Sequence, residues 1–315
     1  MKAVLHHRAS PHMKRQLQEA APSWLKLSVV SGDETAALHR ELADADVLLH
    51  VLQPADRALI AAAPRLRFIQ KIGVGVNTID LAEARSRRIA VANMPGTNSQ
   101  AVCEMTLTLM LAALRRIVSF DAATRRGAGW TLPPDATDSV SEIGGATVGL
   151  LGFGEVPRRL APVLKALGAH VLCVSRRPPQ IDVAENVDLA TLLARSDIMS
   201  LHLPLTPETW QILDAPAFAS MKRGVVIINT ARGGLIDEAA LARALQSGQV
   251  RAVGLDVFAQ EPLPYPHALL ELPGVVCTPH VAWLTPQTLQ RSWAVAFENC
   301  RRLRNDEPLL YQVQA

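Results

Sequence analysis

An arginine, a glutamate and a histidine each stand shortly after an apolar segment in the second half of the chain. They are Arg232 after residues 225–229, Glu261 after residues 252–255 and His280 after residues 275–277. Hydride transfer to a carbonyl builds negative charge on its oxygen, so the reaction needs a cation that polarises the oxygen and an acid that protonates it. Arg232 can polarise the oxygen, His280 can protonate it, and a carboxylate such as Glu261 stabilises a protonated imidazole. The three residues together predict reduction of a 2-keto acid, whose carboxylate suits the planar arginine fork.

Each of these residues also has an ordinary structural interpretation. His50 and His202 follow apolar segments too, and Glu261 with Pro262 is compatible with a plain turn. Arg232 is harder to explain by packing, because it stands at a strand end before two glycines. We favour the catalytic interpretation because all three residue types occur after strands of one predicted sheet, where ligands bind at the carboxyl ends of the strands.

A glycine-containing turn follows the apolar run 147–151. Gly152 and Gly154 precede a helical pattern, so the backbone amides of Glu155 and Val156 are expected to face a pyrophosphate at the helix N-terminus. A Gly-x-Gly pair also marks ordinary turns, and Pro157 stands where a third glycine is expected. Proline is tolerated in a first helical turn, but its ring predicts a helix slightly further from the strand.

The residues after the next apolar run bear on the choice of dinucleotide. Ser175, Arg176 and Arg177 occupy the place where an acidic residue would bind the ribose of NAD. Two guanidinium groups suit a 2′-phosphate, which predicts NADPH as the preferred cofactor with NADH possible. The alternative is an ordinary solvated charge pair in a loop.

The elements that would position these residues alternate along the chain. From residue 147 onward six expected strands alternate with helical patterns, the strands covering residues 147–151, 170–174, 197–201, 225–229, 252–255 and 275–277. This order predicts an α/β fold with a Rossmann-type doubly wound parallel sheet.

The first hundred residues repeat this alternation and predict a smaller, flavodoxin-like α/β domain. Its expected strands cover residues 3–5, 27–30, 47–51, 68–71 and 89–92. A helix from about residue 285 to residue 303 follows the larger sheet and is expected to return to the smaller domain. We therefore predict a discontinuous substrate-binding domain, residues 1–97 and 288–315, and a dinucleotide-binding domain, residues 98–287.

Composition limits the classes of protein to consider. The 315 residues are 49% hydrophobic and 19% charged, with a formal net charge of +3, so we expect no nucleic-acid or membrane partner. The four cysteines lack metal-type spacing and favour a reducing compartment, so we expect no metal ion. The N-terminus lacks the apolar stretch of a signal peptide, and we expect a cytoplasmic protein.

Six segments of the chain resemble, in order and spacing, the signature segments of the D-isomer-specific 2-hydroxyacid dehydrogenases. They are residues 73–80 (GVGVNTID), 93–99 (NMPGTNS), 203–209 (LPLTPET), 229–237 (NTARGGLID), 254–262 (GLDVFAQEP) and 278–283 (TPHVAW). The resemblance spans nearly the whole chain, and its motifs are specific. The Ser175–Arg177 segment resembles that of NADPH-linked glyoxylate and hydroxypyruvate reductases.

The resemblance implies a role for each site residue. Arg232, Glu261 and His280 would be catalytic, with His280 as the general acid. The implied contacts are Val74, Gly75 and Arg232 with the substrate, Thr230 and Ala231 with the nicotinamide ring, Asp256 with the nicotinamide amide, and Glu155 and Val156 with the pyrophosphate. Trp283 has two possible roles, ordinary packing in the core or shaping of the substrate pocket, and the resemblance favours the pocket.

Glyoxylate and hydroxypyruvate are the leading substrates, because residues 72–77 are apolar and a phosphorylated substrate favours a second cation. The alternatives are a D-3-phosphoglycerate dehydrogenase and a dinucleotide-sensing scaffold similar to the corepressors of this fold. The chain ends about a dozen residues after its last expected helix, so we expect it to lack the regulatory domain of many phosphoglycerate dehydrogenases. The resemblance also implies a homodimer, with residues 102–114 as its interface or, equally, as an internal core helix.

Overall fold

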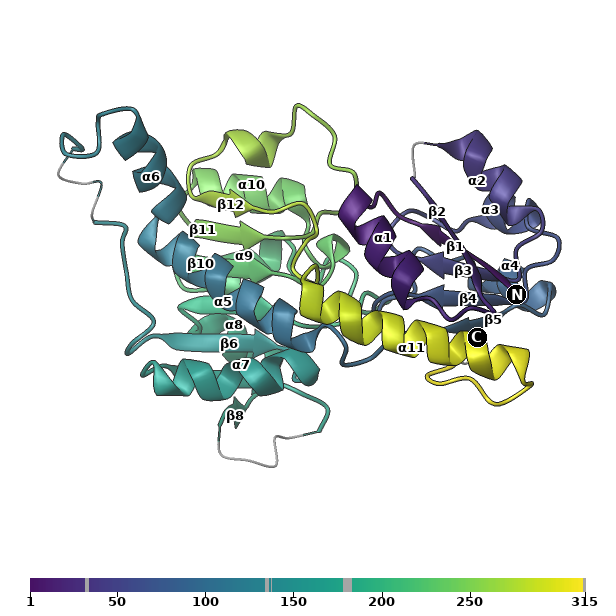
Figure 1. The fold of residues 1–315 in the computed structure, drawn as a ribbon. Coiled ribbons are helices and arrows are strands. Elements are labelled where there is room, and N and C mark those ends of the chain that lie inside the picture. The colour runs from purple at the N-terminus through teal and green to yellow at the C-terminus, as the bar shows by residue number, and fades with distance from the viewer. Residues whose placement is uncertain (32–33, 134–135, 137, 178–182, 314–315) are drawn as a thin grey trace. The chain divides into compact units, whose positions relative to one another are not determined.

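The structure is a computed structural model that describes residues 1–31, 34–133, 136, 138–177 and 183–313. The chain divides into two compact units, the first formed by Met1–Asn98 with Thr285–Ala315 and the second by Ser99–Leu284 (Figure 1). No helix in the described ranges is both long and apolar enough to cross a membrane.

The first unit contains a five-stranded parallel sheet in the order β2-β1-β3-β4-β5. Its strands are β1 (Lys2–His6), β2 (Lys26–Val30), β3 (Val47–His50), β4 (Phe68–Lys71) and β5 (Ala90–Ala92). Its helices are α1 (Pro11–Ala20), α2 (Thr35–Leu42), α3 (Arg57–Ala61), α4 (Leu81–Ser86) and α11 (Pro286–Arg304). The order is that of flavodoxin-like sheets, so the predicted class of the smaller unit is confirmed. All residues of β1, β3 and β4 are buried, as expected for parallel strands covered on both faces.

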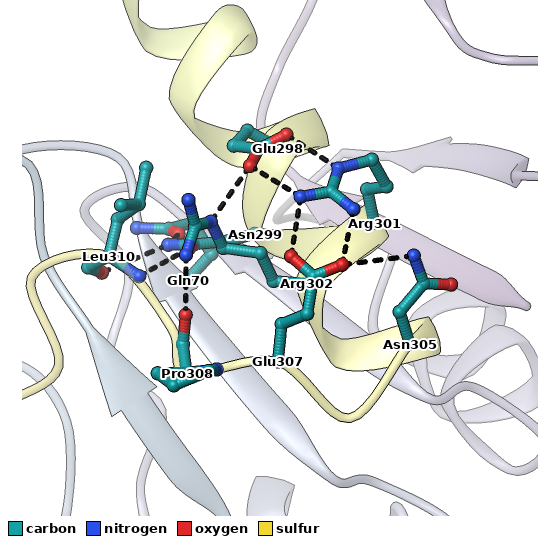
Figure 2. Close-up of polar contacts among 9 residues, drawn as sticks. All are labelled: Gln70, Glu298, Asn299, Arg301, Arg302, Asn305, Glu307, Pro308 and Leu310. Carbon is teal, nitrogen blue, oxygen red and sulfur yellow. Dashed lines mark hydrogen bonds and ion pairs between the residues drawn. The ribbon is translucent and has the colours of Figure 1, made fainter.

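Hydrogen bonds tie α11 to the C-terminal segment and to β4 (Figure 2). The buried Asn299 amide donates to Gln70 Oε1 at 2.6 Å and to the Leu310 carbonyl at 3.1 Å, and its oxygen accepts from the Leu310 N–H at 2.7 Å. Beside it, Arg301 forms paired contacts with Glu298 and Glu307, each between 2.6 and 2.9 Å. These bonds hold Glu307 and Leu310 of the C-terminal segment against α11, and α11 against β4.

The second unit contains a seven-stranded parallel sheet in the order β12-β11-β10-β9-β6-β7-β8. Its strands are β6 (Thr147–Leu151), β7 (His170–Val174), β8 (Glu185–Asn186), β9 (Ile198–Leu201), β10 (Val225–Asn229), β11 (Val250–Leu255) and β12 (Val275–Cys277). Strands continue in both directions from β6, which confirms the doubly wound class. The expectation of six strands was wrong by one. β8 is a two-residue, exposed edge strand without an apolar pattern that would predict it.

Helices cover both faces of this sheet. Buried residues of α5 (Ser99–Arg115) and α7 (Glu155–Ala166) form the core on one face. Those of α8 (Leu189–Arg195), α9 (Ala215–Ser220) and α10 (Glu238–Gln246) form the core on the other. The remaining helical segments are α6 (Ile117–Arg125), η2 (Gly233–Leu235) and η3 (Ala268–Glu271). Because α5 packs against α7, β10 and β11, residues 102–114 are largely an internal core helix.

Candidate active site

The three predicted catalytic residues follow adjacent strands of the second unit. The last residues of these strands are in register, with Asn229 of β10 beside Leu255 of β11 and Leu255 beside Cys277 of β12. Arg232, Glu261 and His280 therefore stand on loops that leave the same edge of one sheet. This edge is the carboxyl end of the strands, where α/β sheets bind ligands.

Glu261 and His280 are in direct contact. His280 Nδ1 lies 2.6 Å from Glu261 Oε2, and the other carboxylate oxygen accepts the Phe258 N–H at 2.9 Å. Burial acts to raise the pKa of Glu261, but its hydrogen bonds and the charges of His280 and Arg232 outweigh this effect and lower the pKa below its ordinary value. Glu261 is thus a carboxylate at neutral pH. Its contact with Nδ1 leaves Nε2 as the imidazole nitrogen that can deliver a proton.

Arg232 is held by the buried side chain that ends β10. Asn229 Nδ2 donates to the Arg232 carbonyl at 2.9 Å, while Asn229 Oδ1 accepts the Ala231 N–H at 3.0 Å. Burial lowers the pKa of Arg232, and the negative charge of Glu261 opposes this effect. The guanidinium remains protonated, because arginine keeps its proton throughout the working range of enzymes.

Asp256 holds the turn that carries His280. Its buried carboxylate accepts from the Thr278 hydroxyl at 2.6 Å and from the Val281 and Ala282 N–H groups at 2.9 Å each, and its carbonyl accepts from the His280 N–H at 2.8 Å. Burial raises the pKa of Asp256, and these donors oppose the rise. His280 has a φ of 54°, in the left-handed region that few non-glycine residues adopt. The contact of Asp256 with the nicotinamide amide stays a prediction.

Trp283 and Thr230 are both buried next to this edge of the sheet. The Trp283 indole N–H donates to the His280 carbonyl at 3.1 Å, so the ring supports the turn from within the unit. The Thr230 hydroxyl lies 2.8 Å from that of Thr106 on α5. The roles of Trp283 in the substrate pocket and of Thr230 and Ala231 beside the nicotinamide stay predictions.

The turn after β6 has the geometry expected of a pyrophosphate cradle. A Cβ at Gly152 would lie 2.8 Å from the His202 carbonyl oxygen, so the chain passes too close for any other residue. A Cβ at Gly154 would meet nothing within 4 Å, which leaves open space at the start of α7. Among the described residues no side chain caps this helix, so the Glu155 and Val156 amides suit an anion. Pro157 is buried in the first turn, where an N–H makes no intrahelical bond.

The segment after β7 is fixed at its first residue. The Ser175 N–H donates to Asn186 Oδ1 of β8 at 3.0 Å, and the Ser175 hydroxyl donates to the Arg177 carbonyl at 2.7 Å. Arg176 and Arg177 are exposed, and neither forms an ion pair with a residue that the structure describes. The strand that sequence reasoning missed, β8, therefore braces the predicted 2′-phosphate site.

The predicted substrate loop belongs to the first unit, where it follows β4. Asn93 Nδ2 donates to the Val74 carbonyl at 2.9 Å, and the Met94 N–H donates to the Gly73 carbonyl at 2.8 Å. The Val74 and Gly75 N–H groups donate to no acceptor among the described residues. Two adjacent backbone donors of this kind fit a carboxylate, and their role stays a prediction.

Sequence reasoning assigned no individual role to several residues that support the site. They are Asn93, Thr106, Asn229, Glu238 and Thr278. Asn229 carried a signal, because an amide at the end of an apolar strand is unusual in a core. The others carried none, since their partners lie between 19 and 124 residues away.

Comparison with known proteins places the chain in a family. Residues 107–282 match the family described as "D-isomer specific 2-hydroxyacid dehydrogenase, NAD binding domain". A D-3-phosphoglycerate dehydrogenase of Mycobacterium leprae is 40% identical over 278 residues, covering 86% of this chain and 52% of that protein. The chain thus spans about half the length of the phosphoglycerate dehydrogenases of this kind that it matches.

Two glyoxylate reductases are also similar. That of Thermofilum pendens is 39% identical over 269 residues, covering 83% of this chain and 79% of that protein. The crystal structure of a glyoxylate reductase from Paecilomyes thermophila has a TM-score of 0.83 and 31% identity, covering 99% of this chain and 98% of that one. The order of the sheets, the strand-end residues and these matches agree, and the chain belongs to the D-isomer specific 2-hydroxyacid dehydrogenase family.

Proposed function

We propose that this protein reduces a small 2-keto acid of the glyoxylate or hydroxypyruvate type to the D-2-hydroxy acid, with NADPH as the preferred cofactor. The observation that supports this most is the 2.6 Å contact between Glu261 and His280 at the edge of the sheet where Arg232 also stands. A carboxylate–imidazole pair beside a guanidinium is what protonation of a developing alkoxide requires.

In this proposal His280 is the general acid. Glu261 binds Nδ1 and stabilises the imidazolium, so Nε2 delivers its proton to the carbonyl oxygen of the substrate. Arg232 polarises that oxygen and binds the substrate carboxylate. The proposed donors to the substrate from the first unit are the Val74 and Gly75 amides. Trp283 shapes the pocket beside His280. When bound, the reduced dinucleotide supplies the hydride.

The residues that would hold the dinucleotide fit such a ligand. Gly152 permits the close approach to the His202 carbonyl, and Gly154 leaves space at the start of α7, where the Glu155 and Val156 amides would bind the pyrophosphate. Thr230 and Ala231 would line the nicotinamide ring, and Asp256 would accept from its amide. Ser175, Arg176 and Arg177 would bind the 2′-phosphate.

The coenzyme preference is tested by kcat/KM for one keto acid with NADPH and with NADH. Two charge-assisted contacts give at least roughly tenfold preference for NADPH. The Arg176→Gln/Arg177→Gln double variant should lose that preference, whereas Arg243→Gln, an exposed arginine on α10, should keep it. A wild-type protein that works better with NADH would contradict the assignment.

The main rival is a D-3-phosphoglycerate dehydrogenase, favoured by relatives of that name at 40% identity. Against it, residues 72–77 carry no charged side chain. The preceding Lys71 is buried, and its ammonium group donates to the Val51 carbonyl. Its side chain therefore points into the interior of the first unit. The deciding comparison is kcat/KM for hydroxypyruvate against its 3-phosphate ester. A higher value for the ester would establish the rival.

A non-catalytic, dinucleotide-sensing scaffold is the alternative from a different class. The His280→Ala variant distinguishes the two functions. In an enzyme it should abolish reduction while NADPH still binds with wild-type affinity. A wild-type protein that binds NADPH yet reduces no small keto acid would support the scaffold.

We also propose a homodimer. Ile117 and Val118 of α6 are 56% and 55% exposed, and Trp130 is 91% exposed, which is unusual for large apolar side chains. Light scattering should give twice the 34.1 kDa mass of the chain. An Ile117→Glu/Trp130→Glu variant should then become monomeric.

A further inference from the structure

We propose that Glu238 is a positioning residue that sets the place of Glu261, and through it of His280, relative to Arg232. Glu238 is the first residue of α10 and follows the N-cap Asp237, so its sequence context predicts only a favourable charge at a helix N-terminus. Its contacts in the structure go beyond that role. The inference rests on the proposed function of the three residues that it connects.

The Glu238 carboxylate binds the loop that carries Glu261. Its Oε1 accepts the Ala259 N–H at 2.7 Å, and its Oε2 lies 3.5 Å from His267 Nε2. The Glu238 and His267 side chains are each 19% exposed, so this pair is largely buried, whereas the Ala259 N–H that Glu238 also binds lies on an exposed turn. The His267 ring also packs edge-on against Phe258, with ring centroids 6.3 Å apart. Glu238 and His267 therefore fix both residues that begin the 258–261 turn.

The same turn is in backbone contact with the segment that follows Arg232. A Cβ at Gly233 would lie 1.8 Å from the Phe258 carbonyl carbon and 2.3 Å from the Ala259 nitrogen, so only glycine permits this approach. Glu238 comes from the same segment, five residues further along. The turn is thus held between Gly233 on one side and the Glu238 carboxylate on the other.

The hydrogen bonds continue from this turn to the imidazole. Phe258, which neighbours Ala259, donates its N–H to Glu261 Oε1 at 2.9 Å, and Glu261 Oε2 contacts His280 Nδ1 at 2.6 Å. A shift of the Ala259 amide therefore moves the carboxylate that orients His280. Displacements of about 1 Å in such a site reduce rates by as much as about 100-fold.

The charged groups around these residues support a positional rather than a direct electrostatic role for Glu238. Glu261 interacts with His280 and Arg232, and His280 also interacts with Asp256. Glu238 pairs instead with His267. Removing only the charge of Glu238 should therefore disturb the position of Glu261 and His280 less than removing its acceptor oxygen does.

The test compares Glu238→Ala with Glu238→Gln, whose amide oxygen still accepts the Ala259 N–H. Glu271→Gln is the matched control, because Glu271 is an exposed carboxylate of η3. The first measurement is the pH titration of the His280 resonances by long-range ¹H–¹⁵N NMR of the protein without cofactor. In Glu238→Ala the titration should move to lower pH, in the direction that Glu261→Gln produces, whereas Glu238→Gln and Glu271→Gln should titrate as the wild type does.

The second measurement is the steady-state kinetics of keto-acid reduction. We expect Glu238→Ala to lower kcat about tenfold, leaving the KM for NADPH unchanged, and Glu238→Gln to restore most of the rate. His267→Ala, which removes the imidazole beside Glu238 but keeps the acceptor oxygen, should give an intermediate loss. It serves as the second variant if Glu238→Ala melts below the assay temperature.

The outcomes separate the two levels of inference. If the wild type reduces no keto acid but the His280 titration still moves in Glu238→Ala, the proposed function fails and the positioning role stands. If the wild type is active and Glu238→Ala matches it in both titration and kcat, the positioning role is overturned. Equal losses in Glu238→Ala and Glu238→Gln would also overturn it, because the acceptor oxygen would then be irrelevant.

Discussion

The residues at the candidate site are held by short polar contacts rather than by apolar packing. Asp256 accepts three donors from the turn of His280, and Asn229 both donates to and accepts from the turn of Arg232. The left-handed backbone of His280 persists because the surrounding bonds determine it. Such fixed geometry is what a general acid needs to reach one atom of a substrate.

In Glu261→Gln, the decrease of kcat/KM for keto-acid reduction at alkaline pH should begin at a lower pH than in the wild type. The carboxylate, whose own pKa is lowered, stabilises the imidazolium, so the variant should lose the transferable proton earlier as pH rises. We also expect kcat to fall by about 100-fold or more at neutral pH. The measurement is the pH profile of kcat/KM, with Glu271→Gln as control. Unchanged profiles would show that Glu261 does not act on His280.

The sequence predicts which residues form the candidate site better than it predicts the contacts that hold them in place. The contact of Glu261 with His280 was expected from the needs of the reaction, and the structure contains it at 2.6 Å. The left-handed φ of His280 and the three donors to Asp256 were not predicted. These features depend on bonds between distant residues, which composition and spacing do not encode.

At the scale of elements, strands with strong apolar runs were predicted residue for residue. This holds for β4, β6, β7, β10 and β12, because continuous runs bounded by turns are typical of buried parallel strands. β8 was missed, since two exposed polar residues form a strand only through pairing with β7. A second helix, α6, after α5 was also not predicted, and its N-cap residue, Arg116, has a left-handed conformation.

Asn299→Ala should lower the free energy of unfolding by about 3 kcal/mol, because it leaves the buried Gln70 Oε1 and the partly buried Leu310 backbone groups without their partner. Urea denaturation measures the change. Asn305→Ala is the control, since this residue of the same region is exposed and its side chain donates to Glu307 at 3.2 Å. A change within about 0.5 kcal/mol is expected for it. Equal effects of the two variants would contradict the role of Asn299.

Acid should weaken the contacts of α11 with the C-terminal segment. Hydrogen bonds from Arg301 hold the pKa of Glu298 and of Glu307 at about 2, below the ordinary 4.5. A lowered pKa in the folded state stabilises the fold above pH 4.5, and this contribution is lost as pH falls from 4.5 towards about 2. The melting temperature of the wild type should therefore fall more steeply over this range than that of Arg301→Met. Parallel curves would contradict the prediction.

At the scale of the whole molecule, the chain builds two parallel sheets of different strand order from one continuous alternation of strands and helices. Each sheet is buried by helices on both faces, so its polar chemistry is confined to loops after strands. The order 2-1-3-4-5 in the first unit and the arrangement about β6 in the second are those of doubly wound parallel sheets. The second unit carries both the Arg232, Glu261 and His280 loops and the glycine turn of the proposed cofactor site.

NADPH should therefore raise the melting temperature of the intact protein more than NADH does. A ligand that binds only the folded state at 100 times its Kd stabilises that state by about 2.7 kcal/mol, which shifts the transition by several degrees. At equal concentrations the weaker coenzyme stabilises less, because this free energy depends on the ratio of concentration to Kd. The Arg176→Gln/Arg177→Gln variant should respond equally to both coenzymes, since the group that differs between them, the 2′-phosphate, would have lost its guanidinium partners. Thermal unfolding at matched coenzyme concentrations measures these shifts without any substrate. Equal shifts with NADPH and NADH in the wild type would contradict the proposed role of the two arginines in cofactor binding.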